Sequence, residues 1–336
     1  MVQTSTVTTI PAREAPPRSE SGLAQRAFAE IRDHFPVWFI LCLSGGHVLS
    51  ALAFVQPPRY AAMVTAIFPL FWVAVYYRIG RANDARLDRP LIVALCVAAV
   101  VLTLLAWLPA RAAWNPADPS AVRSRFEVLA ILWVSLLLLH CLRDRGWPSV
   151  AMFFPVGAIY GFLLENGGIS LGYFSEAGYR YYVPFSRTPI SSVAGWCTVF
   201  YPSVFIAEKL IARTPSWRSR VFLSAALVTA IAISSDLHFD HLATALGMWT
   251  WNPRLPAAFL GVPLVNFTSW LTAVFAFAVL YFLFERRAWS ATSKVAVALL
   301  GIPIVLGIAG VANLMLIGIL EGFSGPSWTI FREALR

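Results

Sequence analysis

Long apolar runs separated by short polar connections follow one another along the chain, and this alternation predicts an all-α integral membrane protein. A helix needs about 20 consecutive apolar residues to cross a bilayer. The runs that approach this length predict nine transmembrane helices, near residues 37–55, 60–77, 90–109, 128–142, 151–169, 193–212, 220–237, 262–284 and 295–320. The fourth run is short for a complete span, so we expect between seven and nine helices.

Three segments of different character divide the chain. Residues 1–36 are polar and rich in Pro, Ser and Thr, which predicts a disordered tail and no signal peptide. Residues 37–150 hold the first group of predicted transmembrane helices. Residues 151–336 hold the remaining helices and most of the unusual polar motifs, and we expect this part to form the catalytic bundle.

Composition and charge agree with a membrane protein. The chain is 58% hydrophobic and 13% charged, whereas a soluble domain averages about 45–50% apolar and about 25% charged residues. The net charge of +9 lies largely in tails and short connections, where it indicates orientation and contact with anionic lipids instead of nucleic-acid binding. With the N-terminus inside, the inner segments hold 17 Lys and Arg and the outer segments 9. This excess predicts a cytoplasmic N-terminus in a bacterial-type cell membrane.

The most unusual polar cluster begins at Asp236, at the end of a predicted span. Asp236 and Asp240 are four residues apart and share one face of a helix, while His238 and His241 are three apart on another face. Asp and His side chains can bind a divalent metal, but no second His-rich segment completes such a site. We therefore expect no metal and favour acids held by hydrogen bonds, or the start of a solvated loop.

Two segments, 165–196 and 236–270, repeat the same order of residues. Each begins with an acid (Glu165 or Asp236), continues through a turn rich in Gly and aromatic residues, and ends with a Pro followed seven residues later by a Trp. Both segments connect helices on the same predicted side of the membrane, so they indicate a weak parallel internal repeat. In membrane proteins, the working site often lies at the interface between such repeats.

Glu165 is an isolated acid in an apolar stretch, Tyr-Gly-Phe-Leu-Leu-Glu-Asn-Gly-Gly. The ionised form of a carboxyl group is disfavoured in such surroundings, which makes Glu165 a candidate proton donor. A purely structural hydrogen bond to a neighbouring helix is the alternative interpretation.

Aromatic residues are numerous around these acids. They could form the interfacial belt that membrane proteins carry at both faces. They could also line a cavity for a long apolar substrate and stabilise a carbocation through their ring faces. The candidate substrate-binding residues are Tyr181, Trp196, Trp249, Trp251, Asn266 and Trp270. Among these, Asn266 could hold a water molecule or orient an acid.

Several catalytic motifs are missing from the sequence. It contains no phosphate-binding P-loop, no Gly-x-Ser-x-Gly elbow, no His-Glu-x-x-His helix and no paired acid motif for diphosphate-bound magnesium. Their absence argues against ATP use, serine hydrolysis and ordinary prenyl transfer.

The motifs after Asp236 resemble those of membrane carotenoid-biosynthesis proteins, a family that includes the bacterioruberin-type and γ-carotene-type carotenoid hydratases. Asp236 and Asp240 precede Leu-Gly-Met-Trp-Thr-Trp at 246–251 and Gly-Val-Pro-Leu-Val-Asn-Phe-Thr-Ser-Trp at 261–270. The segment that begins at Glu165 is similar to the family's first motif. The resemblance covers roughly residues 150–285. Ser and His stand at 269 and 241, where the family has Gly and usually Pro.

The resemblance implies a cofactor-independent hydro-lyase. Such an enzyme would hydrate a terminal isoprenoid double bond of a carotenoid or similar polyene by acid–base chemistry. Glu165 and Asp236 would be acid and base, in either order, with Asp240 as the second candidate for both roles. Its partners would be the hydrophobic substrate and membrane lipids, and could include other enzymes of the pathway.

Two alternatives remain open at this point. The same acid could start a cyclisation, spirocyclisation or isomerisation of an isoprenoid or polyketide polyene. A proton-coupled transporter of lipids or small molecules would instead use Glu165 and Asp236 as relay or binding groups.

Overall fold

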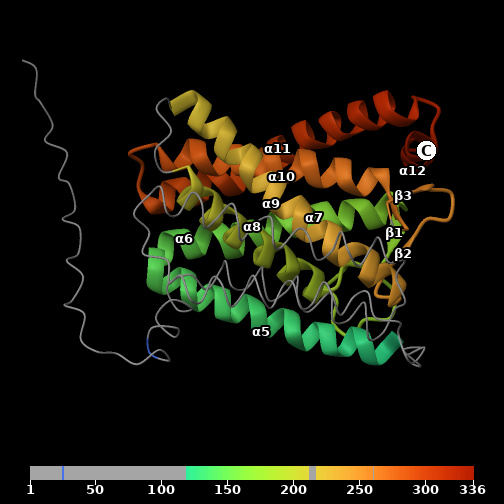
Figure 1. Cartoon of the computed structure of the whole chain (residues 1–336), viewed down its shortest axis with the longest axis horizontal. Helices are drawn as coiled ribbons and strands as arrows, with labels where there is room; N and C mark the ends of the chain where they lie inside the picture. Colours follow the sequence, from blue (N-terminus) through green and yellow to red (C-terminus); the bar gives the residue numbers. More distant parts are fainter. Residues whose placement is uncertain (1–24, 26–118, 212–216, 260) are drawn as a thin grey trace, which may run out of the picture.

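The computed structural model describes residues 25, 119–211, 217–259 and 261–336. The described residues from 119 onward form a bundle of long helices (Figure 1). Six of these helices are long and apolar enough to cross a membrane: Arg123–Arg145, Trp147–Ser170, Ile190–Leu210, Arg220–His241, Leu264–Glu285 and Ala291–Glu321. They correspond to the last six predicted spans. The short fourth run therefore lies in a helix of 23 residues, which is long enough to cross a membrane. Apart from residue 25, the predicted tail and the three earlier spans lie outside the described residues.

The described helices begin at Pro119. They are α5 (Pro119–Arg145), α6 (Trp147–Ala151), α7 (Gly157–Ser170), α8 (Ile190–Leu210), α9 (Trp217–Ala245), α10 (Leu264–Glu285), α11 (Ala291–Glu321) and α12 (Pro326–Ala334). A π-helix, η1 (Met152–Val156), joins α6 to α7 within one span and contains Pro155. Because proline has no backbone N–H and its ring crowds the preceding turn, the wider π turn accommodates it without ending the helix.

Four short strands lie in the loops at one end of the bundle, and the all-α prediction did not include them (Figure 1). β1 (Phe174–Ser175) pairs antiparallel with β2 (Thr250–Trp251). β3 (Ala257–Phe259) pairs with β4 (Val262–Pro263). The β1–β2 pair connects the α7–α8 loop to the α9–α10 loop, so the two segments of the predicted repeat meet through backbone hydrogen bonds.

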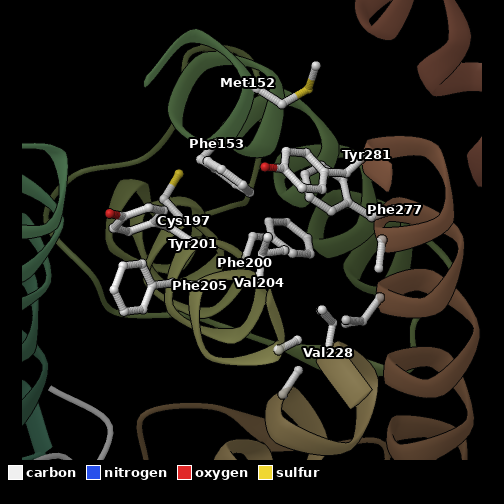
Figure 2. Close-up of a cluster of buried hydrophobic side chains, with 14 of the residues drawn as sticks. Met152, Phe153, Cys197, Phe200, Tyr201, Val204, Phe205, Val228, Phe277 and Tyr281 are labelled. Carbon is white, nitrogen blue, oxygen red and sulfur yellow. The ribbon is translucent and has the colours of Figure 1, made fainter. Parts of the chain in front are cut away.

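The core of the bundle is largely aromatic. α8 packs against α5, α7 and α9, and α10 packs against α9 and α11. Figure 2 shows side chains of this core, including Phe153, Phe200, Tyr201, Phe205 and Phe277. The rings of Phe200 and Phe277 stack with their centroids 4.1 Å apart. These contacts join the helices of both predicted repeat segments into one core.

A glycine brings α7 and α8 close together beside the carboxyl group of Glu165. A Cβ atom on Gly161 would lie 2.4 Å from the Cβ of Trp196. Small residues at helix interfaces allow this close approach in membranes. The position of Trp196 relative to α7 therefore depends on the absence of a side chain at 161.

Candidate active site

Two aspartates on α9 share one amide group of α10. Asp236 and Asp240 lie one helical turn apart, and Nδ2 of Asn266 donates to Oδ2 of Asp236 at 2.8 Å and to Oδ2 of Asp240 at 2.7 Å. All three side chains are buried. Asn266 lies in the first turn of α10, which begins after Pro263. The two hydrogens of a single amide nitrogen thus hold the two carboxyl groups next to each other.

The aspartates lie within a helix and not at the start of a loop. The span predicted to end at residue 237 continues as α9 to Ala245, so the solvated-loop interpretation was wrong. Asp236 is 2% and Asp240 is 5% exposed. The Oδ1 atom of Asp236 is buried and has no hydrogen-bond partner among the described residues.

The histidine of this cluster faces its own helix. Nδ1 of His241 lies 3.0 Å from the carbonyl oxygen of Leu237. Within the described part of the chain, no three His, Cys, Asp or Glu side chains are grouped so that they could hold a metal ion. The side chain of His238 lies outside the described part.

Glu165, near the end of α7, is bound to the first turns of α8. Its Oε2 accepts a hydrogen bond of 2.8 Å from Nε1 of Trp196. The ring of Trp196 in turn stacks on that of Trp270 in α10, with centroids 4.5 Å apart and an interplanar angle of 27°. The structure therefore brings together the final Trp residues of the two predicted repeat segments. It also places Glu165 within electrostatic range of Asp236 and Asp240.

A fourth acid, Glu176, belongs to the same cluster and was not among the predicted site residues. It follows β1 in the α7–α8 loop, is 2% exposed, and accepts a hydrogen bond of 2.8 Å at Oε1 from Oγ of Ser192. Burial raises the pKa of Glu176 well above its usual value, and the nearby carboxyl groups of Glu165 and Asp240 raise it further, against the opposing effect of the Ser192 hydrogen bond. In sequence, Ser-Glu-Ala-Gly-Tyr-Arg looks like an ordinary exposed loop.

These four acids can lose their negative charge by protonation, because no positively charged side chain among the described residues is paired with them. In the described part of the chain, no Lys, Arg or His side chain forms an ion pair with Glu165, Glu176, Asp236 or Asp240. Like charges in a buried site repel one another, so the group cannot be fully ionised without a large energetic cost. The cluster is therefore suited to holding and exchanging protons.

A cavity of about 590 Å³ lies among the loops beside this cluster. Its wall includes Phe174, Glu176, Tyr182, Arg187, Trp251 and Asn252. Of the four clustered acids, Glu176 is the one that lines it.

A family model for carotenoid biosynthesis proteins matches residues 125–327, which is more than half of the chain. The chain belongs to this family. No curated protein and no solved structure matches it. The match confirms the family that the motifs indicated, and it extends beyond the predicted region on both sides.

In this carotenoid biosynthesis protein, the predicted substrate-binding residues fall into separate groups. Trp196, Trp270 and Asn266 contact the acids or each other, as described above. Trp251 lines the cavity, and its Nε1 donates to Oγ1 of Thr244 at 3.0 Å.

The other two predicted residues lie elsewhere in the loops. The ring of Trp249 packs on Phe239 with centroids 5.4 Å apart. Tyr181 is 63% exposed, and its backbone N–H donates to Glu127. The exposure of Tyr181 makes it a poor candidate for a buried cation site.

Proposed function

We propose that this carotenoid biosynthesis protein is a membrane-embedded hydratase that adds water to a terminal isoprenoid double bond of a carotenoid or similar polyene. The observation that carries the proposal is the group of carboxyl side chains held by Asn266 and Trp196, in which both aspartates are buried and Glu165 is partly buried. None of them has an ion-pair partner among the described residues. An apolar, aromatic bundle is a suitable environment for a hydrocarbon substrate.

The reaction requires an acid strong enough to protonate carbon. A carboxyl group that keeps its proton in a buried site can deliver it to the double bond, which forms a tertiary carbocation. Water then adds to the cation, and a carboxylate removes the extra proton to leave the alcohol. Glu165 and Asp236 are our candidates for these two roles, and Asp240 shares the amide group that holds Asp236.

Aromatic rings near the acids would stabilise the cation. The negative face of an aromatic ring attracts a positive charge, and the effect increases when water is excluded. The stacked pair of Trp196 and Trp270 lies beside Glu165 and is the best placed pair of rings for this purpose. The mechanism needs no cofactor.

The test is to express the protein in a host that makes acyclic or monocyclic carotenes and to analyse the extracted pigments by mass spectrometry. We expect a product heavier than its precursor by one water. Glu165→Gln and Asp236→Asn should each lower its formation about 100-fold or more, because a positioned acid or base contributes at least that factor.

Glu127→Gln is the matched control. Glu127 is a buried acid whose Oε1 accepts the backbone N–H groups of Arg180 and Tyr181, and glutamine keeps this acceptor, so product formation should persist. A product of unchanged mass would indicate a cyclase or isomerase. Unaltered pigments together with proton-coupled uptake would indicate a transporter. Full product formation by both acid variants would contradict the mechanism.

A further inference from the structure

The loop cavity opens to solvent on the side of the loops, and its wall mixes polar and apolar side chains. Ser175, Arg187 and Thr250 contribute exposed side chains to its wall. Glu176 is the one buried residue among the described residues that line it. Because the cavity is open to solvent, water can enter it, and one residue of its wall is a buried acid.

Glu176 has a free acceptor atom at this position. Its Oε1 is held by Ser192, while Oε2 is buried and has no partner among the described residues. The backbone carbonyl of Glu176 accepts from the hydroxyl of Tyr182, whose oxygen accepts in turn from the backbone N–H of Tyr179. The loop is therefore fixed, and one carboxylate oxygen remains available.

The repeat gives independent support for a role of Glu176 in the site. Ser192 stands three residues after Pro189, which precedes α8, and Asn266 stands three residues after Pro263, which precedes α10. Both residues donate to acids of the cluster, Ser192 to Glu176 and Asn266 to the aspartates. Glu176 is thus held by the element that corresponds to the holder of Asp236 and Asp240.

We propose that Glu176 is a proton relay that connects water in the loop cavity with the inner carboxyl groups of Glu165 and Asp240. This inference rests on the proposed hydration only where it gives Glu176 a role in turnover. The relay itself is a property of the protein without substrate.

The protons balance over one reaction. A proton that leaves an inner carboxyl group for the double bond is replaced by one from Glu176, which takes its replacement from water in the cavity. The proton released when water adds to the cation returns through an inner carboxylate and Glu176 to the cavity. The net change is the consumption of one water molecule, and no oxidant or reductant is required.

The experiment measures hydrogen–deuterium exchange of the inner carboxyl groups by infrared spectroscopy on the full chain in membranes. The carboxylic C=O band that disappears in Glu165→Gln identifies Glu165. In Glu176→Gln, which keeps an acceptor for Ser192, we expect the fast phase of exchange of this band to be lost. The matched control Glu127→Gln should exchange like the unsubstituted protein, and Glu176→Asp should restore part of the fast phase. A cooperative thermal unfolding transition of Glu176→Gln shows that it folds.

Turnover is measured separately as the water-containing product. We expect Glu176→Gln to lower it about 100-fold, as for other proton-transfer groups. Fast exchange in Glu176→Gln, or no exchangeable band from Glu165, would overturn the relay, even if turnover fell because Glu176 contacts substrate. If the unsubstituted protein forms no hydrated product while exchange depends on Glu176, the relay stands and the proposed hydration fails.

Discussion

Replacing Asn266 with leucine tests whether one amide group holds the aspartate pair. Leucine has a similar size and donates no hydrogen bond, so Asn266→Leu removes the bonds of 2.8 Å to Asp236 and 2.7 Å to Asp240. A buried hydrogen bond contributes about 1.5–3 kcal/mol when the acceptor is charged and about 1 kcal/mol when it is neutral. With one of the two aspartates ionised, Asn266→Leu should lower the free energy of unfolding by about 2.5–4 kcal/mol.

The assay is denaturant-induced unfolding in mild detergent, followed by tryptophan fluorescence. Asn313→Leu is the matched control, because Asn313 lies in another transmembrane helix and its buried Oδ1 has no partner among the described residues. This control should be neutral or stabilising. A loss below about 1 kcal/mol in Asn266→Leu would refute the reasoning, because it is no larger than one neutral hydrogen bond.

Three further predictions concern the surroundings of the acids. Gly161→Ala should cost about 1–3 kcal/mol of stability, because the added methyl group overpacks against Trp196. A Cβ atom at Gly167 in the same helix meets no atom within 4 Å, so Gly167→Ala should be tolerated. Equal melting temperatures of the two variants would contradict this reasoning. Trp196→Phe keeps a ring next to Trp270 but loses the donor to Glu165, so turnover should fall about 10- to 100-fold. Trp328→Phe loses a donor to a backbone carbonyl of α11 and should leave turnover unchanged. Similar turnover in both variants would count against a role for the Trp196 donor. Burial raises the pKa of Glu176 above its usual 4.5 in the folded protein, so above that pH the folded state binds more protons than the unfolded state. The free energy of unfolding should therefore decrease as the pH rises from there. Glu176→Gln should make this decrease with pH less steep, and an equally steep decrease would refute the raised pKa of Glu176.

The sequence was sufficient to predict the six described helices that could cross a membrane, because each carries a long apolar run. The run at 128–142 was the exception in length, and the helix around it extends to 23 residues. It also indicated that Trp196 and Trp270 are related, since both follow a proline by seven residues. The contact between these two rings depends on how α8 and α10 pack. The repeat suggested such a contact, because the working site of a repeat protein in membranes often lies where the repeats meet.

What the sequence did not predict depends on contacts between distant loops. Glu176 looks exposed in its local sequence, and its burial arises from the folding of its loop over the ends of α7 and α8. The β1–β2 pair consists of two residues on each side, which is too short for a recognisable alternation. The role of Asn266 remained open between water and acid, because local sequence does not tell which side chains of α9 lie opposite it.

The different residues at positions 192 and 266 have a consequence for how the two helix pairs can divide the work. If both pairs descend from one duplicated unit, a symmetric ancestor would have carried the same donor and the same acid on each side. Identical acids in identical surroundings have the same proton affinity, so neither is favoured as donor or acceptor. In the present chain, Ser192 offers one hydroxyl to a glutamate and Asn266 offers two N–H groups to a pair of aspartates. The two halves thus differ both in the donor and in the acids that it holds, and this gives them unequal proton affinities.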